Sequence, residues 1–329
     1  MIKLANKTIA FITATMLVAC CSLTIISCAL NKPHKEALNA RQSNSVPIID
    51  TVDYKKTYEA LHKEGKYDEL RKHLQIWEAK EPANPEMFIA YFNYYINRNS
   101  VSKIALDADT ANAINAEAML KDPSTGEITG YIYKPVRYNS EDVSMAVEYI
   151  DNGLSIAPNR LDMRLGKAYI LDEIGNYKNS GDELYAALEA SKDIDKWLWK
   201  NSEEFEGGKA AFLDTIQGNY WQWFDKKTEE SLEQIKRCSE KQIELYPENA
   251  YAYNNLAGYY YIKEQKEKAL EYFLQAELIA PTNCVILINI GKIYFGKKEK
   301  QKAKKYFEKA FNIGNGRDKE YARYFLKKL

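Results

Sequence analysis

A repeated pattern of small and large apolar residues, with a period of about 34 positions, constrains the fold of this chain more than any other feature. In Ala250–Asn283 the pattern has the spacing of two amphipathic helices, and Pro281 follows the second. The residues that carry the pattern are Leu256, Ala257, Tyr260, Ala269, Phe273 and Ala276. The next stretch repeats it in register as Ile290, Gly291, Tyr294, Ala303, Phe307 and Ala310. Small residues at the contact and large ones beside it predict helix pairs that stack on similar neighbours.

This pattern resembles the tetratricopeptide repeat, a helix–turn–helix unit of about 34 residues. The resemblance covers residues 51–329 and implies an all-α superhelix of about six helix-hairpin units. The units are expected at 51–84, at 85–98 joined with 140–158, at 159–191, at 209–247, and at the two stretches described above. Arg317–Leu329 is expected to form a cap helix, and Ser140 and Thr228 are predicted to cap the second helices of units two and four.

Unit two is interrupted by an insertion at about 99–139. Within it, the Ala-rich stretch Ala105–Met119 predicts a helix, and the sequence from Lys121 to Tyr133 predicts a β-hairpin around Pro123 and Gly126. Strand alternation places Tyr131 and Tyr133 on one face, beside backbone that a partner strand is expected to reach. A long ordered insertion in a repeat is either functional or a cover for an apolar groove, and both interpretations stay open.

The first 28 residues have the pattern of an export signal. Lys3 and Lys7 precede a stretch from Thr8 to Leu30 that contains no charged residue. The residues before Cys28 look like a bacterial lipobox, which makes Cys28 the predicted lipidation site; Cys20 and an uncleaved membrane anchor are the alternatives. Residues 29–50 are predicted to form a flexible tether. Each alternative places the repeats outside the cytoplasm, at the cell envelope, in the periplasm or at the cell surface, with the outer membrane favoured.

Composition and motifs argue against nucleic-acid binding and against catalysis. Lys plus Arg and Asp plus Glu both number 46, so the chain has no basic excess. The three histidines are His34, His62 and His73, and no metal-binding, P-loop or nucleophile motif accompanies them. We expect no enzymatic activity, no cofactor and no metal. Cys238 and Cys284 lie in units too far apart for a disulfide and are expected to be small buried residues.

The resemblance also implies a concave groove lined by the first helix of each unit, and the family's groove positions transfer to this chain. The predicted partner-binding residues are Arg160, Met163, Lys167, Tyr251, Asn254, Tyr261, Lys292 and Phe295. A mixture of aromatic, amide and lysine side chains suits an extended peptide or a partner helix. The groove lacks the dense Lys, Asn and Arg set of the family members that clamp terminal carboxylates.

The sequence therefore predicts a membrane-tethered adaptor that binds a protein or peptide partner at the bacterial cell envelope. The alternative is a helical-repeat lipoprotein that binds a glycan or another solute for nutrient uptake. Exposed tryptophans are expected to favour the glycan, and an exposed apolar groove is expected to favour the peptide.

Overall fold

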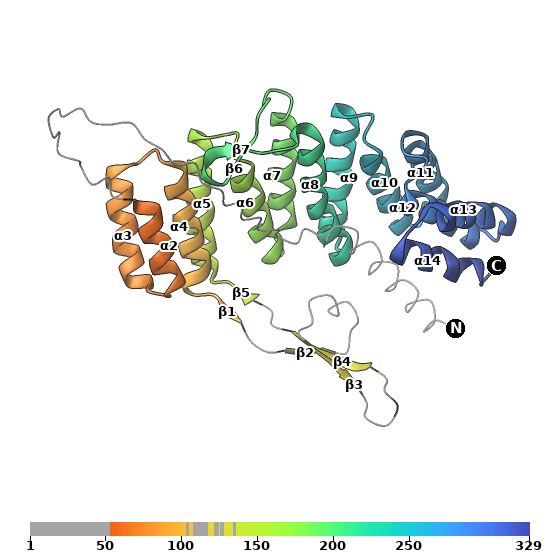
Figure 1. Ribbon diagram of the computed structural model, residues 1–329, viewed down its shortest axis with the longest axis horizontal. Helices are drawn as coiled ribbons and strands as arrows, with labels where there is room; N and C mark the ends of the chain where they lie inside the picture. The colour runs from red at the N-terminus through yellow and green to blue at the C-terminus, as the bar shows by residue number, and fades with distance from the viewer. Residues whose placement is uncertain (1–52, 103–104, 108–117, 122–124, 126–127, 134–135) are drawn as a thin grey trace, which may run out of the picture.

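The computed structural model describes residues 53–102, 105–107, 118–121, 125, 128–133 and 136–329, and these residues form an elongated stack of helix pairs (Figure 1). Thirteen α-helices occur in the described residues, namely six antiparallel pairs and one terminal helix. The pairs are α2 (Tyr54–Lys63) with α3 (Tyr67–Lys80), α4 (Pro85–Arg98) with α5 (Ser140–Ile156), α6 (Leu161–Glu173) with α7 (Tyr177–Ala190), α8 (Gly208–Lys226) with α9 (Glu229–Leu245), α10 (Ala250–Ile262) with α11 (Lys266–Ile279), and α12 (Cys284–Gly296) with α13 (Lys300–Ile313). Helix α14 (Gly316–Leu326) packs on α13 and ends the stack.

Asparagine side chains begin several of the first helices. Asn249 accepts hydrogen bonds from the backbone N–H groups of Tyr251 and Ala252, and Asn283, one repeat later, caps α12 in the same way. The predicted cap Thr228 does accept a bond from the Ser231 N–H. The predicted cap Ser140 is wrong by one residue, because the side chain of Asn139 accepts the bond and Ser140 is the first residue of α5.

The turn between the two helices of units one, three, five and six has a left-handed residue at its centre. Gly65 in unit one and Gly175 in unit three have φ of +69° and +78°, which glycine adopts without a steric penalty. The same position holds Glu264 in unit five and Lys298 in unit six, with φ of +58° and +62°. Each of these non-glycine residues costs the fold about 1–2 kcal/mol.

The repeat core is the predicted one. Ala257, Ala269 and Ala276 are fully buried, and Cα of Gly291 lies so close to Phe307 that an added Cβ would be 2.7 Å from the ring. The large aromatic residues of α8 are also core rather than a ligand platform, since Phe212, Tyr220 and Trp223 are buried. Cys238 is buried as expected. Cys284 is only partly buried, because its Sγ lies at the edge of the core, 3.7 Å from the Ala310 carbonyl oxygen.

The insertion contains β-strands where a helix was expected. Strand β2 (Ala105–Asp107) and strand β3 (Ala118–Lys121) flank β4 (Ile128–Tyr133) in one antiparallel sheet, so the helix predicted over Ala105–Met119 is wrong at both ends; residues 108–117 lie outside the described part. Since β4 is the central strand, β2 pairs with one of its edges at Tyr131–Tyr133 and β3 pairs with the other. The backbone beside Tyr131 and Tyr133 that a partner strand was expected to reach is therefore already paired within this chain.

A second strand pair joins the insertion to the helices. Strand β1 (Val101–Ser102) pairs with β5 (Val136–Arg137), and the three-stranded sheet extends from this stem away from the helix stack (Figure 1). Next to this strand pair, where α4 ends, Arg98 and Asn99 donate hydrogen bonds to the carboxylate of Asp142 in α5. These bonds outweigh the effect of burial and hold the pKa of Asp142 below its ordinary value. The clamp keeps α4 and α5 paired in spite of the inserted residues.

The connection between α7 and α8 forms a small hairpin of its own. Strand β6 (Leu198–Trp199) pairs with β7 (Glu203–Glu204), and the 3-10 turn η2 (Lys200–Ser202) is the tip between them. Trp197 at its base stacks on Phe212 of α8 with ring centroids 5.2 Å apart. We call residues 197–205 the tip hairpin, because its tip reaches back to unit two and unit one.

Candidate binding surfaces on the first helices

Polar side chains join the first helix of each unit to the next in the C-terminal part of the stack. Between α8 and α10, Gln217 and Asn255 exchange two side-chain hydrogen bonds, each 2.9 Å long. Between α10 and α12, the Asn289 amide donates to the Asn254 side-chain oxygen at 3.1 Å. All four side chains are buried. Buried amides need such partners, so these pairs hold the units in register.

The same line of contacts continues toward the N-terminus with charged groups. Between α6 and α8, the Trp223 ring N–H donates to the Asp172 carboxylate at 2.8 Å. Burial raises the pKa of Asp172 to about 6, although hydrogen bonds from Trp223 and Asn219 act in the opposite direction. Between α4 and α6, Arg160 bonds to Glu86. We call this series of contacts from Glu86 to Asn289 the polar seam.

The polar seam uses several residues that were predicted to bind a partner. Arg160 has no exposed surface, and Met163 and Asn254 are buried as well. Lys167 is largely covered and bridges Asp151 and Glu183 at 2.5 and 3.0 Å. Residues of the predicted groove and residues of the polar seam both lie on the first helices. Sequence spacing alone therefore does not distinguish a partner-binding residue from one that contacts the next unit. The structure therefore buries Arg160, Met163 and Asn254, and it pairs the partly buried Lys167 with two carboxylates of this chain.

The remaining predicted residues gather on the first helices of units five and six. Tyr251 is 39% exposed, whereas Tyr261 and Phe295 are partly buried, and the Phe295 ring meets Phe325 of α14 edge-on at 5.4 Å. Lys292 lies between them with 9% of its surface exposed. Its Nζ is 3.4 Å from the Asn289 side-chain oxygen and 5.8 Å from the Tyr261 ring centre.

Lys292 has no carboxylate partner among the described residues, and its ammonium contacts the Asn289 amide and the Tyr261 ring. Burial lowers the pKa of its ammonium to about 8, from an ordinary value of 10.5. A buried cation without a counter-ion is costly, and the other buried cation of this face, Arg160, is paired with two carboxylates. Among the described residues, the Lys292 ammonium is therefore a buried cation whose nearest polar contact is a neutral amide.

A cavity of about 520 Å³ lies at the other end of the stack, between α2, α4 and α6. Its apolar lining comes from units one to three, and the tip hairpin contributes Lys200 and Asn201 to its wall. The side chains that line it are Lys55, Tyr58, Glu59, His62, Trp77, Glu86, Ile89, Ala90, Phe92, Asn93, Ile150, Asp162, Met163, Gly166, Lys200 and Asn201. We call this cavity the N-terminal pocket.

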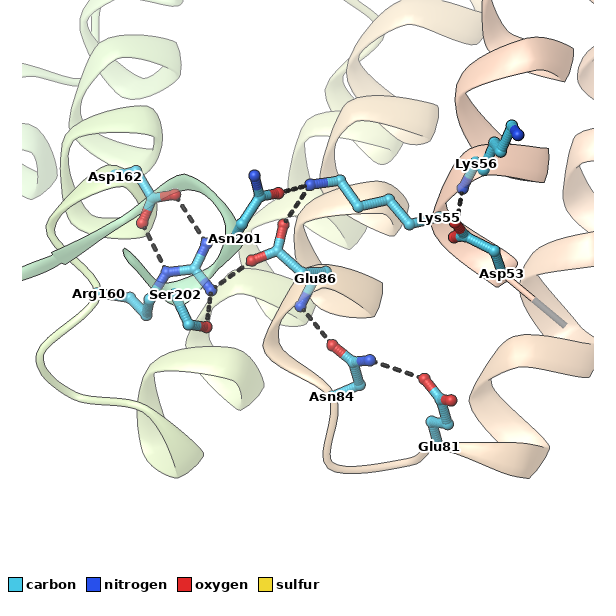
Figure 2. A network of polar contacts seen from close by, with 10 residues as sticks. All are labelled: Asp53, Lys55, Lys56, Glu81, Asn84, Glu86, Arg160, Asp162, Asn201 and Ser202. Atoms are coloured by element: carbon cyan, nitrogen blue, oxygen red, sulfur yellow. Dashed lines mark hydrogen bonds and ion pairs between the residues drawn. The ribbon is translucent and has the colours of Figure 1, made fainter. Parts of the chain in front are cut away.

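A network of ion pairs and hydrogen bonds holds the tip hairpin against the pocket (Figure 2). Arg160 donates to both oxygens of Asp162 at 2.9 and 2.8 Å, to Glu86 at 2.7 Å and to the Ser202 hydroxyl at 3.0 Å. Lys55 of α2 bonds to Glu86 at 3.2 Å and to the side-chain oxygen of Asn201. The network thus ties α2, α4, α6 and the tip hairpin together.

Sequence reasoning missed this pocket. Residues 192–208 lie between the expected units three and four, and no local pattern links Asn201 to Lys55, 146 residues earlier. The sequence signal in this segment is the pair of glycines at 207 and 208, which allows the chain to leave the hairpin and enter α8.

Comparison with known proteins agrees with the repeat pattern. The tetratricopeptide repeat model matches residues 250–283 and 286–313, which are units five and six. These two units are tetratricopeptide repeats, and the described residues as a whole fold as a superhelix of helix pairs that ends in a single terminal helix.

Several solved structures of tetratricopeptide-repeat proteins are similar to this chain at low identity. YrrB, described as a TPR protein with an unusual peptide-binding site, is 15% identical over 78% of this chain and 98% of its own, with a TM-score of 0.38. The C-terminal part of a TPR repeat-containing protein from Cytophaga hutchinsonii is 14% identical over 79% of this chain and 78% of its own, with a TM-score of 0.39. PilF of Pseudomonas aeruginosa is 18% identical over 57% of this chain and 79% of its own, with a TM-score of 0.35. No curated protein matches the sequence.

Tetratricopeptide repeats generally serve protein–protein interaction, and units five and six match that repeat. Among the described residues, no group of three or more His, Cys, Asp and Glu side chains is placed to hold a metal ion. None of the helices in the described ranges is both long and apolar enough to cross a bilayer. Cys20 and Cys28 lie outside the described residues, as do the side chains of Tyr131 and Tyr133.

Proposed function

We propose that the chain is a membrane-tethered tetratricopeptide adaptor that binds an extended, acidic segment of a protein partner at the bacterial cell envelope. The partner segment lies on the first helices of units five and six. Its carboxylate reaches Lys292, and Tyr251 and Tyr261 contact the neighbouring residues of the segment. The adaptor has no catalytic step of its own.

The buried, unpaired ammonium of Lys292 is the observation that carries this proposal. It lies in the repeats that match the family model, and amide groups from Asn254 and Asn289 are beside it. A carboxylate placed there gains a charge-assisted hydrogen bond and removes the cost of an uncompensated buried charge. A partner with an Asp, a Glu or a free C-terminus meets this requirement.

The tryptophans argue against the glycan-binding alternative. All five tryptophans belong to the described residues, and none of them is exposed: Trp77, Trp197 and Trp223 are buried, and Trp199 and Trp221 are partly buried. Sugar rings stack on accessible aromatic faces, whereas an extended peptide needs backbone and side-chain contacts along a helix face. The peptide partner is therefore the better supported ligand.

The tether rests on the N-terminal sequence. An uncharged stretch after two lysines, with Cys28 before a polar segment, supports lipidation at Cys28. Changing Cys28 to Ala should release the protein from membrane fractions or leave an unprocessed precursor, and Cys20→Ala serves as the control. An intact Met1 in the mass spectrum of the wild-type protein would contradict lipidation.

The partner site is tested by removing one positive charge. Lys292→Met keeps the length of the side chain, and Lys305→Met removes an equally positive but exposed residue of α13. Cross-linking in envelope preparations, followed by mass spectrometry, should join wild-type and Lys305→Met proteins to the same acidic partner segment. Lys292→Met should lose this cross-link while its melting temperature stays equal or rises, because a desolvated ammonium has been removed. Equal cross-linking by all three proteins would overturn the proposal.

A further inference from the structure

We propose that the terminal helix α14 binds an anionic phospholipid surface through its outer face. This face, which we call the basic end face, consists of Arg317, Tyr324, Lys327 and Lys328. The inference rests on the membrane tether of the proposed function and is independent of the partner site at Lys292.

The last unit and α14 together carry an excess of positive charge. Residues 284–329 contain 13 Lys and Arg residues against 4 Asp and Glu residues. The whole chain has 46 of each kind, so the rest of the chain has an equal excess of negative charge. A neutral chain with one positive end is attracted to a negative surface by that end.

The residues of the basic end face lie on one side of the helix. Arg317, Tyr324 and Lys327 are seven and three residues apart, which brings them to the same side of an α-helix. The helical path continues beyond Leu326, since the Lys328 N–H bonds to the Phe325 carbonyl oxygen. Lys328 Nζ lies 4.8 Å from the Tyr324 ring centre. All four side chains are exposed, and the buried side of α14 packs on α13 and α12.

The positive charges of this face are not neutralised by the described part of the protein. The acidic residues of α14 are Asp318 and Glu320. Glu320 is paired with Arg323 at 2.6 Å, and Asp318 is partly buried. The three cations of the basic end face have no ion pair with a carboxylate among the described residues. They are therefore available to negative groups outside the chain.

The arrangement of these charges fits a lipid surface. From Arg317 to Lys328 the helix rises about 16 Å, so the cations reach several headgroups rather than one acidic side chain. Each Lys or Arg close to an anionic bilayer adds its own attraction. Tyr324 is 43% exposed, and its ring joins an apolar body to a hydroxyl group. Tyrosines of this kind are enriched at the level of the headgroups in membrane proteins.

The position of α14 gives the contact a structural consequence. It ends the stack at the opposite end from α2, which follows the proposed tether in the sequence (Figure 1). A single lipid chain binds a membrane reversibly, and a basic patch is one of the second signals that make the attachment stable. The tether also raises the effective concentration of the basic end face at the bilayer. Contacts at both ends place the stack along the membrane surface.

The experiment uses the full chain in lipid nanodiscs of two compositions. One contains phosphatidylglycerol mixed with phosphatidylcholine, and the other contains phosphatidylcholine alone. Both include a phosphatidylcholine analogue with a diazirine on its headgroup, and mass spectrometry locates the photo-cross-links. We expect labelling of residues 316–328 to be roughly tenfold or more higher in the phosphatidylglycerol discs. Added salt should abolish this difference, because it screens exposed charges.

Matched variants separate the basic end face from the net charge of the chain. The test variant combines Arg317→Gln, Lys327→Gln and Lys328→Gln. The control carries Lys→Gln at three other exposed lysines without an ion pair among the described residues, namely Lys72, Lys192 and Lys226. The test variant should lose the label by roughly tenfold or more, whereas the control and a variant with Arg at 327 and 328 should keep it. All variants should melt as the wild type does, since the changed side chains are exposed.

The outcomes separate this inference from the proposed function. Equal labelling of α14 in the two kinds of disc, or full labelling of the test variant, would overturn the inference and would not affect the Lys292 cross-link. If the chain does not stay in the discs, the tether is wrong, and flotation with phosphatidylglycerol vesicles decides the inference. Wild-type protein that floats when the test variant does not would support it, and wild-type protein that does not float would overturn it. If α14 is labelled as expected but Lys292→Met keeps its cross-link, the inference stands and the acidic partner site is wrong.

Discussion

The two ends of the helix stack are built from the same unit but are held together differently. In units five and six, alanines and the glycines Gly258 and Gly291 set the helix spacing, and neutral amides such as Asn254 and Asn289 join the units. In units one to three, the corresponding contacts are ion pairs centred on Arg160, and the tip hairpin packs against them from outside the repeats. The C-terminal end is a regular solenoid, whereas the N-terminal end is closed by a non-repeat element.

This difference teaches where to look for specific binding in a repeat protein. A regular unit contacts only its neighbours, so its stability is a sum of local terms. The network around Arg160 joins α2, α4, α6 and the tip hairpin, and it creates a pocket that no single unit contains. The feature that distinguishes this chain from a regular repeat array thus lies where a non-repeat segment contacts several units.

The largest expected effect comes from a buried charge, and it tests how many units lose their structure at each end of the stack. Ala269 and Ala146 are both fully buried on second helices, and an Asp at either position places an unpaired carboxylate in the core. Each change should cost several kcal/mol. Hydrogen exchange should show units five and six losing protection together in Ala269→Asp, while units one to three keep theirs. An unchanged melting temperature of Ala269→Asp would contradict the assigned register.

The second prediction compares the charged and the neutral parts of the polar seam. Arg160→Leu leaves Glu86 and Asp162 without their main partner and should lower the free energy of unfolding by about 3–5 kcal/mol. Asn255→Leu leaves only the Gln217 amide unsatisfied and should cost about 1–3 kcal/mol. Urea unfolding measures both free energies of unfolding. Equal decreases would mean that the charged and the neutral parts of the polar seam contribute equally to stability.

The third prediction uses pH at the centre of the seam. The pKa of Asp172 is about 6 in the folded protein and 3.8 ordinarily, so between these values the folded state binds more protons than the unfolded state. The contribution of this group to stability therefore rises as pH falls from about 6 to about 4. Asp172→Asn lacks the ionisation. Its stability relative to wild type should be highest above about pH 6 and should decline toward about pH 4, as followed by denaturant unfolding.

The smallest effect concerns the turns. Gly65→Ala forces a Cβ into a left-handed turn and should destabilise unit one by about 1 kcal/mol. Glu264→Gly relieves the same conformation in unit five and should stabilise it by about 0.5–1 kcal/mol. Calorimetry should therefore show opposite shifts in melting temperature, and shifts of the same sign would show that the turns are not equivalent.

The repeat itself was predictable because its information is local. Ala257, Ala269 and Phe273 predict the helix contact by spacing alone, and the structure buries all three. The insertion was harder, since the Ala-rich stretch after Ala105 has helix propensity, yet pairing with β4 makes strands of its described ends. Propensity is a weak guide where a neighbouring strand offers backbone hydrogen bonds.

The candidate sites were less predictable than the fold. Lys292 was on the expected list, but its burial and missing counter-ion depend on the packing of α10 against α12. Arg160 was expected at the surface and is instead the centre of a network that includes the distant Ser202. Contacts of this kind join segments that carry no shared pattern, so spacing within a helix does not reveal them.

The tip hairpin also has a consequence for the order in which the protein matures. Lys55 and Asn201 are 146 residues apart, so the helices of units one and two leave the ribosome long before the hairpin does. Closing so long a loop adds little entropy cost beyond that of a shorter one, since each doubling costs about 0.6 kcal/mol. The N-terminal pocket therefore acquires its last wall only when the chain has been made beyond unit three. The complete pocket is a property of the nearly finished chain, and nascent repeats do not yet possess it.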